Sequence, residues 1–347
     1  MSGKILLGAF VGLCFVACGR APESVPAREK AFERSARLAA DSVSLPYLVH
    51  PFRWYVQGDR LWLLDNHTDR FGHAFALPGV APVCQFGRQG RGPGEFLSPG
   101  LACMQREDET ALFESMPNRL CLYRQQGDTV TPIQTLQFPV WMEARALPKA
   151  YSRLWQTRDS ALYIGISFPP RFPEVDLLDM NVPQVRASLS FLQTGSEEAG
   201  SYPYLFTAAY CRGKLVLAYQ YIDRIEVYDV DRDGFRLDYA IGTGQPQEEL
   251  SIRNEDDRMI RHYTAVQCDD QRIYALYQGY PDGAFGSDDI LSTLEIYRSE
   301  DGTGELRADL GRRIDDIALD TARHTLYGYS AVCDSAQFYT FDLAGLR

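Results

Sequence analysis

The chain has 347 residues, of which 45% are hydrophobic, 12% aromatic and 23% charged, and this balance is typical of a folded globular protein. The formal net charge is −11, from 35 basic and 46 acidic residues. Lysine and arginine do not gather in runs, so the composition argues against a nucleic-acid-binding surface.

The first residues have the features of an export signal. A single lysine, Lys4, precedes an uninterrupted apolar run from Ile5 to Val16. This run is too short to cross a bilayer as a permanent helix, and its length is typical of a secretory signal. We therefore predict that the protein is exported.

The apolar run ends in Phe15-Val16-Ala17-Cys18. This ending resembles the bacterial lipobox, in which a small residue precedes a cysteine that is diacylated. The resemblance implies a lipoprotein signal peptide over residues 1–17, lipidation of Cys18 and a lipid bilayer as partner. The protein is then expected in the bacterial cell envelope, on the periplasmic side or at the cell surface. The alternative is an ordinary signal peptide cleaved near Ala17.

Residues 18–44 are polar and charged, and we predict a lipidated tether there, with a short helix over Glu29–Ala40. No later stretch reaches the ~18 apolar residues that a transmembrane helix needs.

A short motif that ends in an aromatic residue recurs after the tether, and each copy follows a second apolar stretch and a polar turn. Units of ~40–50 residues with about four short strands are typical of propeller blades. The six copies are Phe71–Phe75, Arg119–Tyr123, Ala187–Phe191, Arg224–Tyr228, Thr293–Tyr297 and Gln337–Phe341.

These units predict an all-β fold, a six-bladed β-propeller over residues 45–347 with four-stranded antiparallel blades. The last unit, Arg313–Leu343, has room for three strands, so we expect residues near Ser42–Val49 to supply the fourth and close the ring. Two long intervals predict surface insertions, at 169–186 and around 245–261, the second with a short helix over Gln247–Arg261.

The stretch Gly87–Phe96 reads GRQGRGPGEF. It resembles a loop of bacterial six-bladed propellers of the TolB-like and NHL-repeat type. With the lipobox, the whole chain resembles the TolB-like propeller lipoproteins. The resemblance implies a connection from the outer strand of one blade to the inner strand of the next. We favour this structural role over phosphate binding, since no helix follows the glycines. These families share no single activity, so the resemblance predicts fold and location.

Residues in or beside a connection into an inner strand are expected to face a central funnel. They are the candidate ligand-binding residues: Arg88, Arg91, Glu95, Arg261, His262 and Arg313.

One segment has the pattern of a cation site. Asp229, Asp231 and Asp233 alternate before Gly234, as at the start of an oxygen-lined calcium loop. The alternative is a hairpin turn, in which Asp and Gly are common for conformational reasons. We expect no other cofactor.

The chain carries no H-E-x-x-H, G-x-S-x-G, S-x-x-K or Walker A motif, so we predict no catalytic residues. Six cysteines besides Cys18 would remain after export. An even number in an exported protein permits disulfides, but we expect mostly free, buried thiols. Two of them, Cys211 and Cys268, end strands at equivalent places of neighbouring units. The six are Cys84, Cys103, Cys121, Cys211, Cys268 and Cys333.

The predicted function is a membrane-anchored binding or scaffold module, a monomer, with an envelope protein, peptide or glycan as partner. The alternative is a metal-dependent, lactonase-like hydrolase or lyase with its site in the central tunnel, where Asp315 and Asp316 would be candidate ligands.

Overall fold

The computed structural model describes residues 26–45, 48, 51–66, 68–114, 118–137, 150–167, 173–189, 205–242, 259–284, 290–331 and 337–346. The predicted lipidation site Cys18, most of the second predicted insertion with its helix, and Cys333 lie outside these residues.

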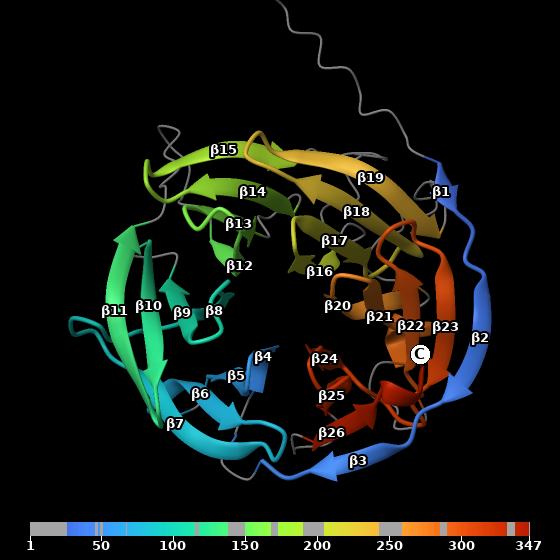
Figure 1. Ribbon diagram of the computed structural model, residues 1–347, viewed down its shortest axis with the longest axis horizontal. Coiled ribbons are helices and arrows are strands. Elements are labelled where there is room, and N and C mark those ends of the chain that lie inside the picture. Colours follow the sequence, from blue (N-terminus) through green and yellow to red (C-terminus); the bar gives the residue numbers. More distant parts are fainter. Residues whose placement is uncertain are drawn as a thin grey trace, which may run out of the picture.

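Six four-stranded antiparallel blades stand around a central axis, as the sequence predicts (Figure 1). Blades 1 to 3 contain β4 (Pro51–Gln57), β5 (Arg60–Asp65), β6 (Arg70–Ala76), β7 (Ala81–Arg88), β8 (Gly100–Cys103), β9 (Glu109–Glu114), β10 (Arg119–Gln126), β11 (Thr129–Gln137), β12 (Tyr151–Gln156), β13 (Leu162–Ser167), β14 (Glu174–Asp179) and β15 (Gln184–Leu189). Blades 4 to 6 contain β16 (Phe206–Cys211), β17 (Lys214–Tyr219), β18 (Arg224–Val230), β19 (Phe235–Gly242), β20 (Ile260–Cys268), β21 (Arg272–Pro281), β22 (Thr293–Arg298), β23 (Gly304–Asp309), β24 (Asp316–Asp320), β25 (Thr325–Ser330) and β26 (Gln337–Asp342).

The first strand of each blade lies next to the axis. The inner strands of blades 2 and 3 also pair with each other over a short parallel stretch, Ala102 with Leu154 and Cys103 with Trp155, so these two blades form one eight-stranded sheet. Two short 3-10 turns, Asp282–Ala284 and Ala344–Leu346, complete the described elements. No helix in the described part of the chain is long and apolar enough to cross a membrane.

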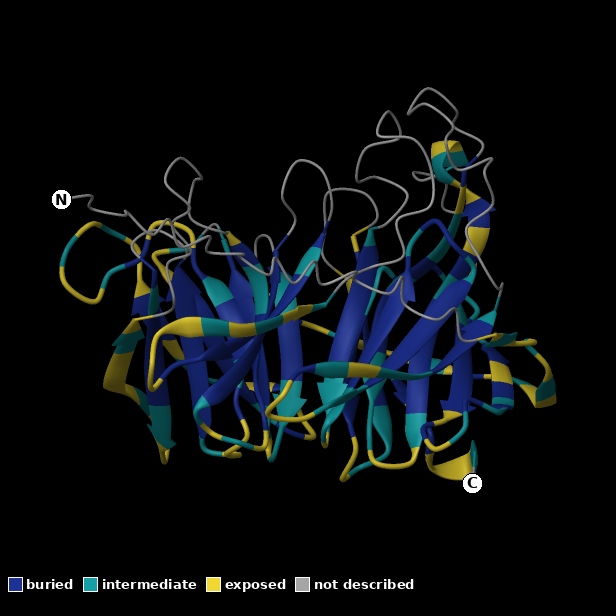
Figure 2. Cartoon of the chain, turned by 90° about the horizontal axis from the view of Figure 1, so that it is seen from above, coloured by how far each residue is buried: buried dark blue, intermediate teal, exposed yellow. Residues whose placement is uncertain are grey.

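The core consists of six hydrophobic clusters, and each lies between two neighbouring blades. Strand β5 shows how the sequence produces this arrangement. Leu61 and Leu63 pack towards blade 6, whereas Trp62 and Leu64 pack towards blade 2. Successive side chains of a strand point to opposite faces, so a continuous apolar strand serves both neighbours at once. All four side chains are fully buried, as Figure 2 shows for the interior of most strands.

The ring closes where the sequence predicts. Strand β3 (Ala40–Val43) pairs antiparallel with β26, from Val43 opposite Phe338 to Ala40 opposite Phe341. The closing strand therefore overlaps the start of the predicted segment Ser42–Val49. It supplies the fourth strand of blade 6.

The predicted helix over Glu29–Ala40 does not form, and most of the described part of the predicted tether belongs to the propeller. Strand β1 (Ala27–Arg28) pairs parallel with β19, and β2 (Phe32–Arg37) pairs parallel with β23. With β3 they make an outer belt, residues 27–43, across blades 4, 5 and 6 (Figure 1). The open outer edges of β19 and β23 offer unpaired backbone groups, and pairing there prevails over local helix propensity.

The predicted insertion at 169–186 is also corrected. Its described part contains β14 and the start of β15, the outer hairpin of blade 3. In the other blades the aromatic-ended motif lies in the third strand. In blade 3 the third strand is β14, and the described part of the motif Ala187–Phe191 lies in the fourth strand, β15. Carboxylates within β14 obscured its strand pattern, although Asp176 and Asp179 are both buried.

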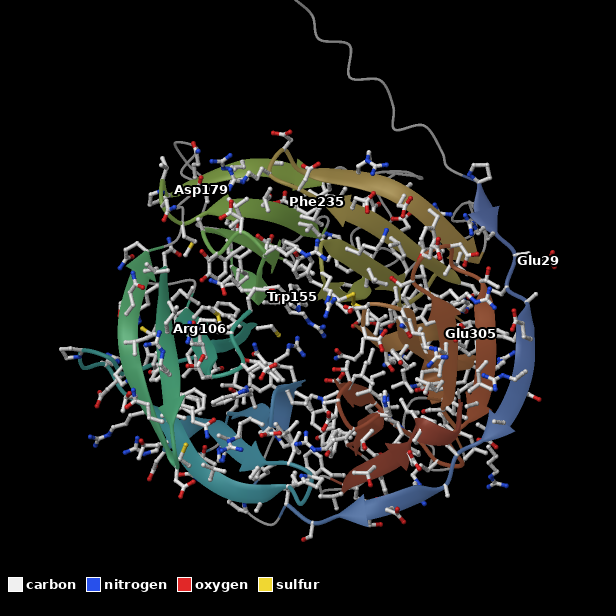
Figure 3. All side chains as sticks on the ribbon, viewed as in Figure 1. Glu29, Arg106, Trp155, Asp179, Phe235 and Glu305 are labelled. Carbon is white, nitrogen blue, oxygen red and sulfur yellow. A yellow bond between two sulfur atoms is a disulfide. The ribbon has the colours of Figure 1, made fainter. Side chains whose placement is uncertain are left out.

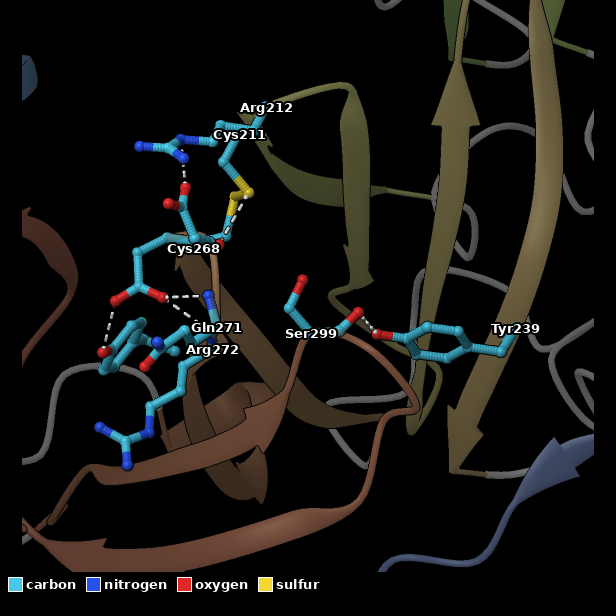
Figure 4. Close-up of a disulfide and its surroundings, with 10 residues drawn as sticks. Cys211, Arg212, Tyr239, Cys268, Gln271, Arg272 and Ser299 are labelled. Atoms are coloured by element: carbon cyan, nitrogen blue, oxygen red, sulfur yellow. Dashed lines mark hydrogen bonds and ion pairs between the residues drawn. A yellow bond between two sulfur atoms is a disulfide. The ribbon is translucent and has the colours of Figure 1, made fainter. Parts of the chain in front are cut away.

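The prediction that Cys211 and Cys268 stay free is wrong, because they form a disulfide between blades 4 and 5 (Figure 4). Their strands, β16 and β20, end side by side around the axis, with the two Cα atoms 6.0 Å apart. This separation lies in the usual range for a disulfide. Cysteines at equivalent positions of neighbouring blades are therefore close enough to bond. Cys84, Cys103 and Cys121 are free thiols.

Further contacts join blades 4 and 5 outside the disulfide. Tyr239 donates a hydrogen bond to Ser299 O at 2.8 Å, and Arg212 forms an ion pair with Asp270 (Figure 4).

A buried carboxylate recurs in the middle of two of the aromatic-ended motifs. In blade 4, Glu226 accepts hydrogen bonds from the hydroxyls of Tyr219 and Tyr228 at 2.8 and 2.7 Å, and Arg224 Nε donates to it at 2.7 Å. Arg224 stands two positions before the glutamate, on the same face of β18. The carboxylate charge is therefore balanced within the blade.

In blade 5 the balancing cation comes from the belt. Glu295 accepts from the hydroxyls of Tyr263 and Tyr297, but the position two residues earlier is Thr293. Lys30 Nζ instead lies 3.2 Å from Glu295 and 2.8 Å from Asp223. The belt thus supplies a charge that the blade motif lacks.

We predict that Lys30→Met lowers the free energy of unfolding by about 2 kcal/mol. Breaking a buried ion pair costs ~3–5 kcal/mol, and the loss is smaller here because Arg307 stays 3.7 Å from Glu295 and Lys30 is 15% exposed. Chemical denaturation measures the change. Adding Thr293→Arg, which copies blade 4, should restore part of it. Arg34→Met, an exposed cation of the same belt, should have little effect; an equal loss in both variants would contradict the prediction.

We also predict that the free energy of unfolding of the Cys211→Ala, Cys268→Ala double variant is about 2–4 kcal/mol lower than that of the wild type. The reason is that the disulfide closes a loop with a sequence separation of 57 residues. Thermal unfolding with and without reductant provides the measurement. Reductant should lower the Tm of the wild type and leave that of the double variant unchanged. Equal sensitivity of the two proteins would contradict the bond.

Candidate functional site

The central axis holds a cavity with a volume of about 380 Å³. Every blade contributes its inner strand to the wall: β4, β8, β12, β16, β20 and β24. The lining also includes Gly58, Gln105 and Thr321, which follow inner strands, so the cavity opens at the end where these strands finish. This is the face on which the C-terminal end lies (Figure 2). We call this cavity the channel.

Glutamine side chains in the wall join neighbouring inner strands. Gln57 Nε2 donates to Met104 O and Arg106 O, both at 2.7 Å. Gln105 and Gln156 bond each other's backbone, from Gln105 Nε2 to Gln156 O at 2.8 Å and from Gln105 N to Gln156 Oε1 at 3.1 Å. These side-chain amides form hydrogen bonds with backbone groups at the channel wall, where strands of different blades lack continuous backbone pairing.

Two arginines lie in the channel wall. Arg53 is the third residue of β4 and Arg153 the third residue of β12. Trp155, on the same strand as Arg153, also lines the channel (Figure 3). Arg153 Nη1 donates to Ala208 O in blade 4 at 3.1 Å, and Arg53 Nη1 donates to Phe52 O at 2.9 Å.

The charges of this group influence one another. Repulsion by Arg153 is the largest cause that lowers the pKa of Arg53 to about 10, and burial adds to it. Asp316, on β24, acts on Arg53 in the opposite direction. Burial raises the pKa of Asp316, although the two arginines partly offset this effect. Two cations and one carboxylate therefore share a low-dielectric space.

The free thiol in the wall is not activated. Burial raises the pKa of Cys103 to about 12, despite the opposing effect of Arg153. A thiol with such a pKa stays protonated at neutral pH, so Cys103 is a poor nucleophile.

The structure places none of the six predicted binding residues in the wall of this channel. Arg88, Arg91 and Glu95 belong to the connection from β7 to β8, which runs from an outer to an inner strand as expected. The Glu95 carboxylate accepts the Gly92 N–H at 2.8 Å and lies 3.6 Å from Arg88 Nε. Arg91 is exposed.

Two glycines of this loop have a specific structural requirement. A Cβ at Gly90, whose φ is +155°, would lie 2.0 Å from Glu95 Oε2, and Gly87 has a φ of +69°. The loop ends at Phe96, which is fully buried between blades 1 and 2. Its glycines therefore allow the connection to close over the inter-blade core, as predicted.

The other three predicted residues lie where inner strands begin. Arg261 pairs with Asp282, with Nε 2.8 Å from Oδ1. His262 stands beside the Lys30–Asp223 pair, with Nδ1 4.0 Å from Asp223 Oδ1, and burial lowers its pKa. Arg313 is buried and donates from Nε to Asp315 at 2.9 Å. These residues form three separate contacts at the opposite end of the inner strands from the channel opening.

The three predicted calcium ligands lie in and beside the hairpin between β18 and β19. Asp229 accepts from Lys214 Nζ at 3.1 Å and pairs with Arg236. Asp231 Oδ1 accepts the N–H groups of Asp233 and Gly234 at 2.8 and 3.2 Å, as in an Asx turn. The hairpin therefore has a structural explanation, and calcium binding stays a prediction.

Arg53 and Arg153 are not among the residues predicted from the sequence, because the repeat motifs do not mark the inner strands of blades 1 and 3. A signal was present: both strands read as apolar and aromatic segments with one arginine at the third position, PFRWY and YSRLW. Asp316 was considered only as a metal ligand. Across the described ranges, no three His, Cys, Asp or Glu side chains are grouped as a metal site would require.

We predict that Asp316→Asn stabilises the protein at neutral pH. Because folding raises the pKa of this carboxyl, its stabilising contribution is present below the unfolded pKa of ~3.9 and is lost as pH rises through the folded value. The difference in Tm between variant and wild type should thus narrow from pH 7.5 to pH 4.5. Asp315→Asn is the control: it removes an acceptor of Arg313 and of Ala331 N, and should destabilise at neutral pH. Destabilisation by Asp316→Asn at neutral pH would contradict the prediction.

Comparisons with known proteins support the architecture. Residues 31–161 match the family described as TolB-like 6-blade propeller-like. The "Putative exported protein" of Bacteroides fragilis has a similar solved structure, with a TM-score of 0.58 and 11% identity, covering 91% of this chain and 98% of its own. A luciferin-regenerating enzyme matches with a TM-score of 0.54 and 10% identity, over 89% of this chain and 96% of its own. No curated protein matches the sequence.

At these identities the solved structures show a common fold alone. The family match covers blades 1 and 2 and the start of blade 3, and the same four-stranded unit continues around the ring. The chain is a six-bladed propeller whose residues 31–161 match the TolB-like family, in agreement with the resemblance of its glycine-rich loop and repeats.

Proposed function

We propose that this protein is a binding module of the bacterial cell envelope that is anchored through acyl chains on Cys18 and holds a small ligand in its channel. The observation that carries the proposal is the cavity of about 380 Å³ lined by all six inner strands. Small-molecule sites usually have volumes of ~300–1,000 Å³ and combine apolar walls with a few polar groups. The volume of the channel lies in this range, and its wall contains both apolar side chains and a large share of polar ones.

Two observations support export. The Cys211–Cys268 disulfide is typical of proteins that fold outside the cytoplasm. The similarity to a Bacteroides fragilis structure whose printed description is an exported protein agrees with this location. Both are consistent with the predicted signal peptide over residues 1–17.

The belt would keep the propeller close to the bilayer. Only residues 19–26 lie between Cys18 and Ala27, the first residue paired with β19. At ~3.3–3.6 Å per extended residue, blade 4 would lie within about 30 Å of the lipid anchor. An envelope protein, peptide or glycan could meet the faces of a monomer held in this way.

The metal-dependent hydrolase gains no support from the site. Its tunnel would need several carboxylate or imidazole ligands grouped together. The channel wall carries two arginines and the carboxylates Glu107 and Asp320, and within the described ranges no three His, Cys, Asp or Glu side chains are grouped as a metal site would require. No observation favours catalysis over binding, so we put forward the binding function alone.

We predict that the wild type, expressed in a Gram-negative host, enters the detergent phase on phase separation and that the Cys18→Ala variant enters the aqueous phase. Mass spectrometry of the wild type should find a mature N-terminus at an acylated Cys18. Cys14→Ala is the matched control, because Cys14 follows Leu13 and lacks the small residue before it. An aqueous wild type cleaved near Ala17 would overturn the anchor.

A further inference from the structure

We propose that the channel binds a small organic anion, whose carboxylate or phosphate group is held between Arg53 of β4 and Arg153 of β12. This inference rests on the proposed function, because it names the chemical class of the ligand that the channel would hold.

The two guanidinium groups have unused donors. A guanidinium carries five N–H donors, and each of these two arginines has one hydrogen bond to a backbone carbonyl. Within the described ranges, neither forms an ion pair with a carboxylate. Arg53 Nε is buried and has no hydrogen-bond partner there. A buried donor without an acceptor is unfavourable unless a ligand or water accepts it.

The charges next to the two arginines favour an anion. Asp316 interacts electrostatically with both arginines, and Glu107, which also lines the cavity, is exposed to solvent. Asp320, which also lines the cavity, accepts from Arg323 N and Nη1, both at 3.0 Å, so its charge is already balanced. The repulsion between Arg153 and Arg53, which lowers the pKa of Arg53, also favours a bound anion. An anion between the two arginines would replace repulsion with two attractive contacts.

The geometry of the side chains suits carboxylates and phosphates. Guanidinium groups bind both through parallel N–H···O bonds, and such charge-assisted bonds are stronger in a space that excludes water. The arginines come from blades 1 and 3, on either side of blade 2, so an anion that contacts both would lie in the channel itself.

The remaining wall indicates what the rest of the ligand is like. Leu101, Leu154 and Trp155 supply apolar surface to the same cavity as the arginines. Gln57 Oε1 is buried without a hydrogen-bond partner in the described structure, and it could accept from a hydroxyl or amide group. A compact molecule with one anionic group and an apolar or aromatic body therefore fits best.

The test is isothermal titration calorimetry on the full chain purified in detergent, with three probes of similar shape: phenylacetate, phenyl phosphate and the neutral phenylacetamide. We expect both anions to bind. The affinity of the neutral amide should be at least ~10-fold lower, because it lacks the charge that the two arginines attract; a tenfold change in affinity corresponds to about 1.4 kcal/mol. The ratio of the two anion affinities then distinguishes a carboxylate from a phosphate ligand.

Variants locate the binding site. Arg53→Gln and Arg153→Gln should each weaken anion binding ~10-fold or more, and the double variant should show no binding. Arg236→Gln is the matched control, because Arg236 is 72% exposed on the outer strand β19. Asp316→Asn should tighten anion binding several-fold, an increase that a damaged channel would not produce. Thermal unfolding checks that each variant is folded.

Equal binding of phenylacetamide and phenylacetate would overturn the anion inference and leave the proposed binding function intact. Anion binding that survives in both arginine variants would place the site elsewhere and overturn it as well. If none of the three probes binds, the anion inference fails, while the lipidation of Cys18 still tests the proposed function independently.

Discussion

Burial of apolar side chains between neighbouring blades is the constraint on which this structure depends. Each blade has two apolar faces, and a single four-stranded sheet cannot bury both. Six hydrophobic clusters, one for each pair of neighbouring blades, show that the ring satisfies this condition everywhere. The pair formed by blades 6 and 1 would be missing in an open array, so closure of the ring is part of the core.

The N-terminal belt stabilises the closed ring. Strand β3 completes blade 6, and β1 and β2 cover the outer edges of blades 4 and 5. Edges with unpaired backbone groups are prone to association with other chains. The belt covers the edge of β23 from Gly304 to Asp309 and two residues of β19, and Lys30 adds an ionic contact that blade 5 cannot supply itself. The segment nearest the predicted anchor is thus also a structural part of the propeller.

The same architecture explains the channel. Inner strands of different blades diverge around the axis, so side chains replace the backbone ladder there, and glutamines join adjacent strands. A polar wall inside an apolar ring is a place where charges are shielded from bulk water. Arg53 and Arg153, both partly buried, occupy that place with one hydrogen bond each to a backbone carbonyl. Such groups are where function is sought in a fold that itself implies no activity.

Local patterns in the sequence were sufficient for much of this molecule. The apolar strands and their repeat predicted six blades, and the glycines predicted the structural role of the Gly87–Phe96 loop, because these features depend on residues close together in the chain. The closing strand joins the two ends of the chain, and it was predicted because the final unit has room for only three strands. Only the tertiary structure decided the belt, the Cys211–Cys268 bond and the neighbourhood of Arg53 and Arg153. These features join residues that are far apart in sequence. Whether a polar side chain meets a neighbour, an open edge or a channel depends on how the ring brings the strands together.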